Sequence, residues 1–268
     1  MTTHYLPNTA QLAMFKEKAS AEYWDKHWSS FEFKKTLQNT WSSIFSEVVH
    51  KYLVKGSKIL EAGSGAGNVL GALKNNGYQV TGIDIAGETL ARLKEIDNSL
   101  SLARTDVHSL PFVDQSFDGV ISGGVIEHFW DGFEQPLSEA ARVLRKGGFL
   151  FLTFPYRSPL RRLKLFFNCY SSLREEREVE RVRSNFYQYF LKREEVLSFT
   201  RELGFKTVEV RALDGIKGFK DEVSWAKPFL QEIYDNVSPN SFKYRALDRA
   251  LRIFSGHIAR CVLQKVSS

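Results

Sequence analysis

The stretch Lys58–Asn68, KILEAGSGAGN, decides the fold of this chain. Its apolar run has the character of a buried parallel strand, and it ends in an acidic residue directly before a glycine-rich turn. Three glycines, Gly63, Gly65 and Gly67, free the backbone to turn tightly, and residues 68–74 (NVLGALK) continue at helical spacing. A strand, a glycine turn and a helix in this order predict a ligand bound on the turn.

The glycine spacing and the local charge indicate which ligand this is. A dinucleotide fingerprint needs Gly-x-Gly-x-x-Gly, but here the third glycine comes one residue early and Asn68 takes its place. Glu61 stands at the mouth of the turn, where a carboxylate would repel a pyrophosphate. S-adenosylmethionine has no phosphate and carries an ammonium and a sulfonium, so the charge of Glu61 favours this cofactor over NAD.

Four motifs in order resemble the class I S-adenosylmethionine-dependent methyltransferases, of the small-molecule type with a type 11 methyltransferase domain. The motifs are EAGSGAG (61–67), YQVTGIDIA (78–86), Asp106-Val107 followed by LPFVDQSFDGVIS (110–122), and GGVIEHF (123–129) followed by EAARVLRKGGFLFLTFP (139–155). The resemblance covers roughly residues 58–155, with a weaker part from 186 to 210. One Gly-x-Gly is a weak signal, whereas four ordered motifs are a strong one.

The resemblance implies a cofactor site made of the following residues: Glu61, Gly63, Ser64, Gly65, Gly67, Asp84, Ile85, Asp106, Val107 and Ser122. In the family, the acid at the end of the second strand binds both ribose hydroxyls, and that acid is Asp84 here. An acid after a strand can instead cap the next helix. Asp84 stands seventeen residues after Gly67, where ribose recognition would need it, so we favour the ribose role.

The resemblance also implies the fold class, which is α/β with a Rossmann-like seven-stranded sheet. Its strand order would be 3-2-1-4-5-7-6, with the last strand antiparallel and helices on both faces. We expect a single methyltransferase domain over residues 1–268, long enough for a sizeable core. Its predicted parts are a helical cap (1–55), a cofactor-binding core (56–155), a basic lid insertion (156–190) and a segment that completes the sheet (191–268) and contains a helical insertion (219–256).

Residues 10–53 have apolar side chains at helical spacing and are predicted to form the helical cap. Within it, AEYWDKHW (21–28) brings four aromatic side chains close together, namely Tyr23, Trp24, His27 and Trp28. In the resembling family an N-terminal helix often folds over the methionine end of the cofactor, so these side chains are candidates for a lid. The alternative is that they only pack the cap onto the sheet.

The basic insertion follows the predicted fifth strand. Residues 157–193 hold ten Lys or Arg against four Glu, which equals the net charge of +6 of the whole chain. Leu160, Leu163 and Phe167 share one predicted helix face, with three basic residues around them, Arg161, Arg162 and Lys164. This pattern predicts a lid for an anionic or lipid-linked small-molecule acceptor, with a peripheral membrane contact through residues 157–170. A solvated charged hairpin is the equally weighted alternative.

Methyl transfer from a sulfonium needs a nucleophile held against the methyl carbon and protected from water. A hydroxyl acceptor also needs a base, and His128 in GGVIEHF is the first candidate, with His27 and Tyr156 next. His128 could instead only brace the loop. Quinone-precursor methyltransferases of this family carry Glu-x-x-Glu-His here; Glu127 and His128 match, but Gly124 replaces the first Glu, so we predict no metal.

Composition narrows the remaining function classes. No apolar run approaches the ~20 residues of a membrane span, and the N-terminus lacks a signal-peptide core, so a cytoplasmic and at most membrane-peripheral location is expected. The two cysteines give no disulfide scaffold or zinc spacing. DNA is not an expected partner. The alternatives are an RNA methyltransferase, for which no RNA-binding module is recognisable, a nicotinamide oxidoreductase and an inactive cofactor-binding protein. The acceptor and the oligomeric state have no sequence signal.

Overall fold

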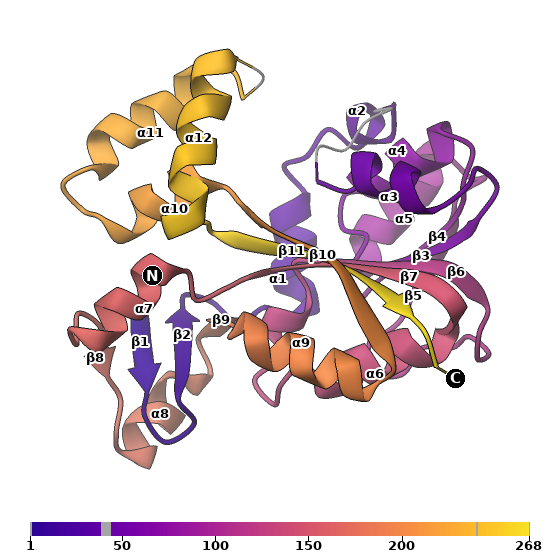
Figure 1. The fold of residues 1–268 in the computed structure, drawn as a ribbon. Coiled ribbons are helices and arrows are strands. Elements are labelled where there is room, and N and C mark those ends of the chain that lie inside the picture. Colours follow the sequence, from indigo (N-terminus) through magenta and orange to yellow (C-terminus); the bar gives the residue numbers. More distant parts are fainter. Residues whose placement is uncertain (1, 39–43, 240, 268) are drawn as a thin grey trace.

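A computed structural model describes residues 2–38, 44–239 and 241–267. Its centre is a seven-stranded sheet with the order β10-β11-β7-β6-β3-β4-β5 (Figure 1). The strands of this sheet are β3 (Lys58–Ala62), β4 (Gln79–Asp84), β5 (Ser101–Arg104), β6 (Phe117–Gly123), β7 (Leu144–Pro155), β10 (Phe205–Leu213) and β11 (Ile258–Lys265). Only β11 is antiparallel to its neighbours. The predicted order 3-2-1-4-5-7-6 is therefore confirmed.

The helices that the structure describes connect and cover these strands. They are α1 (Ala21–Trp28), α2 (Phe33–Gln38), α3 (Ser46–Tyr52), α4 (Asn68–Asn75), α5 (Gly87–Ile96), the 3-10 helix η1 (Ile126–His128), α6 (Glu134–Val143), α7 (Pro159–Phe166), α8 (Glu176–Arg183), α9 (Arg193–Glu202), α10 (Gly215–Glu222), α11 (Lys227–Asn236) and α12 (Phe242–Ser255). None of these helices is long and apolar enough to cross a bilayer.

The strands bury both faces because their side chains alternate between two separate cores. Ile59 of β3 packs with α3 and α4 on one face, and Leu60 packs with α6 and α9 on the other. Neither of these side chains is exposed to solvent. Figure 1 shows the corresponding layers, with α3, α4 and α5 on one side of the sheet and α6 and α9 on the other. Burial on both faces explains the uninterrupted apolar runs of these strands in the sequence.

A second sheet of four strands corrects the prediction that residues 10–53 are helical. Its order is β8-β1-β2-β9, with β1 (Thr2–Leu6), β2 (Gln11–Phe15), β8 (Ser171–Ser172) and β9 (Phe186–Phe190). The helical prediction fails at β2 because both faces of this strand are buried, so its apolar residues run without alternation. The cap helices begin only at α1, and residues 39–43 of the predicted cap lie outside the described residues.

The insertion after β7 is helical only in part. The predicted helices at its start and in its charged half are α7 and α8, but β8 lies between them and β9 closes the segment. Strand β9 pairs with β2, so the insertion and the N-terminus build the small sheet together. The sequence predicts two helical patterns within residues 219–256, but the structure has three helices there, and the first of them begins before this segment, at Gly215. These helices, α10, α11 and α12, are grouped on one side of the molecule in Figure 1.

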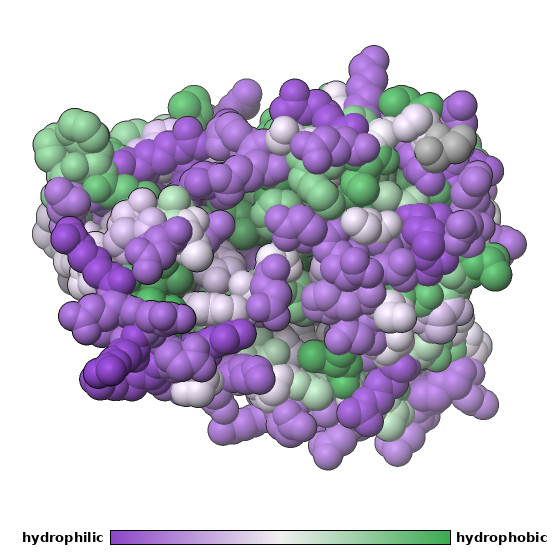
Figure 2. All heavy atoms as spheres, turned by 90° about the horizontal axis from the view of Figure 1, so that it is seen from below, coloured by the Kyte–Doolittle hydropathy of each residue, from purple (hydrophilic) through white to green (hydrophobic). Residues whose placement is uncertain are grey.

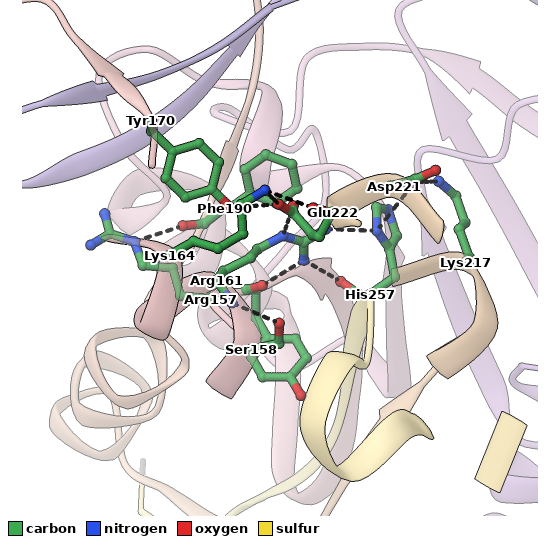
Figure 3. Close-up of polar contacts among 11 residues, drawn as sticks. Arg157, Ser158, Arg161, Lys164, Tyr170, Phe190, Lys217, Asp221, Glu222 and His257 are labelled. Carbon is green, nitrogen blue, oxygen red and sulfur yellow. Dashed lines mark hydrogen bonds and ion pairs between the residues drawn. The ribbon is translucent and has the colours of Figure 1, made fainter. Parts of the chain in front are cut away.

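The basic residues of α7 correct a second prediction, that they face an anionic acceptor. Arg161 is completely buried; its Nε donates to Glu222 Oε1 at 2.8 Å, and its guanidinium lies 4.0 Å from the Phe190 ring centre (Figure 3). Lys164 Nζ and Tyr170 Oη both donate to Oε2 of the same carboxylate, at 2.7 and 2.6 Å. Glu222 thus already forms ion pairs with both of these cations. Of the apolar residues on this helix face, only Leu160 is buried.

Arg161 should be one of the strongest single determinants of stability in this chain. Replacing Arg161 by Ala leaves the buried Glu222 carboxylate short of a partner, and breaking a buried pair in this way costs about 3–5 kcal/mol. Arg162→Ala is the matched control, because Arg162 is half exposed and pairs with Glu194 at the surface, an interaction worth about 0–1 kcal/mol. Urea unfolding measures both, and equal losses would contradict the analysis.

Candidate functional site

The turn between β3 and α4 is fastened to the end of β4. The Gly65 N–H donates to Asp84 Oδ2 at 2.8 Å, and the N–H groups of Gly63 and Ser64 both donate to the Ile83 carbonyl at 2.9 Å. Gly63, Gly65 and Gly67 have φ values of 85°, 46° and 80°, which side chains rarely adopt. A Cβ on Gly65 would also lie 2.6 Å from the Trp28 ring. Geometry and space therefore both require glycine at Gly65.

Two cavities open on this turn, and Trp28 lines both of them. The first, of about 110 Å³, is lined by the candidate residues Gly63, Asp84, Ile85, Asp106, Val107 and His128, together with Trp24 and Trp28. The second, of about 460 Å³, is lined by the candidate residues Glu61, Gly63, Ser64 and Gly65, and also by Phe45, Thr153 and Ile258. Gly123 and Gly124 border both cavities. The structure thus brings eight of the ten predicted cofactor residues, and His128, to one place.

Gly67 and Ser122 line neither cavity. Gly67 is the N-cap of α4, and a Cβ there would press on Leu37 and Leu93 at 3.1 Å, so the fold itself accounts for this glycine. Ser122 is buried in β6, where it pairs with Ala62 of β3. For both residues the structure offers a role in packing, and a contact with the cofactor remains a proposal.

The buried carboxylates at the turn have unusual environments. Burial raises the pKa of Glu61 well above its ordinary value, and the nearby Asp84 raises it further. Burial also raises the pKa of Asp84, although the N–H groups of Ala86 and Gly65 hydrogen-bond to its carboxylate and oppose this shift. Glu61 Oε2 and Ser64 Oγ are buried without a hydrogen-bond partner in the described structure. These orphaned acceptors fit a ligand that brings an ammonium and other donors to the turn.

Asp106 differs from these two carboxylates because it is exposed to solvent. Partial burial would raise its pKa, but hydrogen bonds from the His108 N–H at 2.9 Å and the His108 ring at 2.6 Å outweigh this and lower it. Asp106 is therefore ionised at neutral pH. Its neighbour Val107 is buried at the wall of the first cavity and offers an apolar surface beside this charge.

Helix α1 covers the first cavity and is held there by Asp25. This carboxylate accepts hydrogen bonds from the N–H and Oγ1 of Thr89, both at 2.8 Å, and so caps the N-terminus of α5. Trp24 and Trp28 then line the cavity, and their rings stack 5.9 Å apart. Tyr23 and His27 lie beside them but do not line the cavity. Two of the four predicted lid residues thus reach the candidate site.

His128 is buried at the end of η1, where its ring contacts Trp24 and Tyr187. Its Nδ1 lies 2.6 Å from the Tyr187 carbonyl oxygen. A carbonyl can only accept, so Nδ1 carries the proton and Nε2 is left as an acceptor. Burial lowers the pKa of His128 to about 4, although the bond to Tyr187 opposes this shift. His128 is therefore a neutral acceptor at physiological pH.

Tyr187 and Glu127 are site residues whose roles the sequence did not reveal. Tyr187 comes from β9 in the insertion, and its carbonyl fixes the tautomer of His128. An aromatic strand motif, FYQYF, was the available signal, but it lies about sixty residues from His128. Glu127 is buried, with its pKa raised to about 8 by burial and with Oε2 unpartnered. Within the described residues, no group of three metal-ligating side chains is present.

The two reserve candidates for a base lie away from His128. Tyr156 follows β7 and is buried, which raises its pKa, and its carbonyl accepts from Arg161. His27 is an exposed residue of α1, although the burial of part of its ring, followed by the charge of Lys16, lowers its pKa. Neither side chain lines the cavities that contain the candidate cofactor residues. The geometry therefore favours His128 over both.

Known proteins share this arrangement of motifs. Residues 60–152 match the family described as the methyltransferase domain. The chain carries a class I S-adenosylmethionine-dependent methyltransferase domain. S-adenosylmethionine is the methyl donor of this domain.

Individual relatives of this methyltransferase domain cover only parts of the chain. A probable S-adenosylmethionine-dependent methyltransferase of Mycolicibacterium smegmatis is 34% identical over 41% of this chain and 44% of its own length. A demethylmenaquinone methyltransferase of Chlorobaculum parvum is 30% identical over 44% of this chain and 50% of its own. The chain thus spans half or less of these two relatives.

Among solved structures, the [4+2]-cyclase SpnF matches with a TM-score of 0.55 and 15% identity, over 95% of this chain and 100% of that one. At this identity the likeness shows a shared fold alone. The same fold thus occurs in a protein named for a different reaction, so the function of this methyltransferase domain has to be argued from its site.

The protonation of His128 gives a test of the site geometry. At pH 6, NMR of the ring nitrogens should show a neutral imidazole with the proton on Nδ1, because the folded pKa is about 4. In the unfolded chain His has a pKa of about 6.5, so it takes up a proton at a higher pH than the folded His128 does. The free energy of unfolding is therefore unaffected above pH 6.5 and decreases as the pH falls from 6.5 toward 4. The loss should reach about 3 kcal/mol.

His128→Gln is the comparison protein, since it keeps Glu127 but has no imidazole. Urea unfolding at several pH values between 4 and 7 should show the stability of the wild type falling relative to this variant as the pH drops. Parallel pH profiles for the two proteins, or a charged imidazole at pH 6, would show that His128 is solvated rather than buried.

Proposed function

We propose that the protein transfers a methyl group from S-adenosylmethionine to a small-molecule acceptor. The observation that carries this proposal is the pair of orphaned buried acceptors, Glu61 Oε2 and Ser64 Oγ, beside the glycine turn and Asp84. Buried polar atoms are rarely left without partners, and those that are suggest a missing ligand. A cationic ligand would also explain why a carboxylate is retained at a site where burial strongly disfavours its charge.

Each part of the cofactor would have a matching group in the two cavities. Glu61 and Ser64 would hold the methionine ammonium and carboxylate end, where Gly63 and Gly65 allow close approach of the backbone. Asp84 would accept from the ribose hydroxyls, because its two present hydrogen bonds leave lone pairs free. Ile85, Asp106 and Val107 would bind the adenine. The core over residues 56–155 would thus supply the cofactor site, and the other segments would shape the acceptor side.

The sulfonium supplies the activated methyl group, so the protein has to position the acceptor and exclude water. Trp24 and Trp28 would exclude water, since both lie over the cavity wall. His128 would accept a hydrogen bond at Nε2 from an acceptor hydroxyl and take up its proton as the oxygen gains the methyl group. Its lowered pKa makes it a weak base, so orientation of the hydroxyl is the larger part of its role.

A hydrophobic or lipid-linked acceptor agrees with the aromatic surroundings of the site. The Chlorobaculum parvum relative is named for demethylmenaquinone, and an acceptor of that kind would fit between aromatic side chains. An anionic acceptor loses support at Arg161 and Lys164, which both already pair with Glu222, although Arg162 remains half exposed. For the proposed membrane contact of residues 157–170, the exposed Phe166 and Phe167 are the available groups.

A protein that binds the cofactor without methylating is the main competing function, because a protein of the same fold is named for a cyclisation. The mass of the acceptor after the reaction distinguishes the two functions. Mass spectrometry with a labelled methyl donor and a panel of quinol, phenol and amine acceptors should show a product one methyl group heavier. An unmodified acceptor in the presence of bound cofactor would favour the competing function. RNA methylation would instead appear as label in RNA.

Asp84→Ala should weaken the binding of S-adenosylmethionine by about 1–3 kcal/mol, because hydrogen bonds to a charged group are lost. Calorimetry with the cofactor measures this. Asp114→Ala is the control, since Asp114 pairs with Arg142 and lines neither cavity. An unchanged affinity in Asp84→Ala, or tighter binding of NAD than of S-adenosylmethionine by the wild type, would sink the cofactor assignment.

His128→Ala should lower kcat by about 10²-fold or more with a hydroxyl acceptor, while cofactor affinity stays nearly intact, because the base acts on the acceptor. The pH–rate profile gives a second readout. The acidic limb that belongs to His128 should lie near its lowered pKa of about 4 and disappear in the variant. An unchanged kcat would remove His128 from the mechanism, and a limb near pH 6.5 would contradict its burial.

A further inference from the structure

The outward side of α11 and α12 carries large apolar side chains that remain in contact with solvent. Trp225, directly before α11, is 82% exposed, and Phe229 on α11 is 66% exposed. On α12, Phe242 is 81% and Ile253 is 79% exposed. These four residues define the α11–α12 face. Phe242 and Ile253 line one hollow, and large apolar side chains exposed side by side mark an interaction site more often than a neutral surface.

The fold does not need these side chains for its own packing. The three helices α10, α11 and α12 already share a small core of their own, built on Ile216, Ala226 and Leu230. Further side chains from the inner sides of the helices pack around it, namely Phe219, Val223, Ile233, Tyr244, Leu247 and Leu251. The apolar residues of the α11–α12 face are therefore additional to a complete core, which points to a partner outside the chain.

Helix α12 also offers a shallow hollow on this face, of about 740 Å³. Ala246 and Ala250 border it together with Phe242 and Ile253, and Arg245 and Arg249 contribute their side chains. Figure 2 views the molecule from below, whereas Figure 1 places α11 and α12 at the top, and the surface visible from below is mostly hydrophilic. Apolar and basic groups thus alternate along one helix.

The charge of this face is net positive. Lys227, Lys243, Arg245 and Arg249 are exposed, and none of them forms an ion pair with another described residue. The carboxylates on the same helices compensate part of this charge. Asp248 is buried and binds Arg252 and the Ile216 N–H. Asp235 accepts from the neutral amide of Gln231 and keeps its charge. Asp235 and Glu232 therefore offset two of the four positive charges, and the face stays net positive.

The group of α10, α11 and α12 lies at the same end of the strands as the candidate site. Leu213 at the end of β10 pairs with Ile258 of β11, which pairs in turn with Pro155 at the end of β7. Strands β6 and β7 are parallel, so the end of β7 lies on the same side of the sheet as Gly123, the last residue of β6, which borders the two cavities. A surface that holds α11 and α12 would therefore lie beside the acceptor side of the site.

We propose that the α11–α12 face docks on a lipid bilayer that contains anionic phospholipids. Trp225, Phe229, Phe242 and Ile253 would enter the boundary between headgroups and acyl chains, where aromatic and aliphatic side chains are favourable. Arg245, Arg249 and the two lysines would bind lipid phosphates. RNA fits this face less well, since Ile253 and the alanines offer no stacking surface for bases. The docking does not depend on the proposed methyl transfer.

Sedimentation of the full chain with vesicles tests the proposal. One set is phosphatidylcholine alone and the other is phosphatidylcholine mixed with phosphatidylglycerol, each at low and high salt. Binding should be at least about tenfold stronger to the mixed vesicles, because each basic residue near an anionic surface contributes about 1 kcal/mol. High salt should reduce this preference, since it shortens the reach of the charges.

Two double variants separate the apolar and basic contributions, and each has a matched control. Arg245→Gln with Arg249→Gln should lower binding to mixed vesicles about tenfold or more, whereas Arg177→Gln with Arg181→Gln on α8, exposed and equally spaced, should not. Phe242→Ser with Ile253→Ser should lower binding to the mixed vesicles as well, whereas Val54→Ser with Val113→Ser, also exposed, should leave it unchanged. All substituted side chains are exposed, so the variants should remain folded.

Three outcomes would overturn the proposal. In the first, the α11–α12 variants and their controls bind vesicles alike. In the second, the wild type does not bind vesicles and forms a dimer that Phe242→Ser with Ile253→Ser dissociates, which would make the face an interface between two copies. In the third, it binds single-stranded RNA through Arg245 and Arg249 and ignores vesicles.

Discussion

The hydrogen bond from the Gly65 N–H to the Asp84 carboxylate is the contact on which the site depends. It joins the turn after β3 to the end of β4, so two neighbouring strands determine one loop. The turn can approach β4 this closely because its glycines adopt positive φ and carry no Cβ. Helix α1 then reaches the turn through Trp28, whose ring occupies the space over Gly65. The lid, the turn and the ribose candidate are thus positioned by one another.

The same region concentrates an unfavourable electrostatic arrangement. Glu61, Asp84 and Glu127 are all buried, and burial raises the pKa of each. Burying carboxylates costs free energy unless they are paired, and Glu61 and Glu127 each keep an unpartnered oxygen. A fold selected for stability alone would place apolar residues at such positions. The arrangement is understandable if a cationic ligand supplies the missing partner, which makes the site a place where stability is exchanged for binding.

The sequence predicted the central sheet well because its information is local. The glycine turn, the acid at the end of β4 and each apolar strand are each encoded by a stretch of about ten residues. Right-handed crossovers then leave few ways to connect the strands. The small sheet was not predictable in the same way. Strand β2 buries both faces, which removes the alternation that marks a strand, and its partner β9 lies more than 170 residues away in the sequence. The role of Tyr187 at His128 depends on that pairing.

Charge was the least reliable guide, and Arg161 shows why. A run of basic residues is usually solvated, and a basic helix after the fifth strand suggests a surface for anions. Glu222, some sixty residues further along the chain, reverses this reading, because it meets Arg161, Lys164 and Tyr170 at once.

The Arg161 guanidinium also binds the carbonyl of Tyr156 and the ring of His257, so one buried cation joins the insertion, α10 and the start of β11 (Figure 3). The insertion, α10 and the segment before β11 therefore meet in one ionic cluster. Since that cluster lies where β7 ends and β11 begins, a change in it should disturb the segments that we propose to shape the acceptor side, and should affect the glycine turn less.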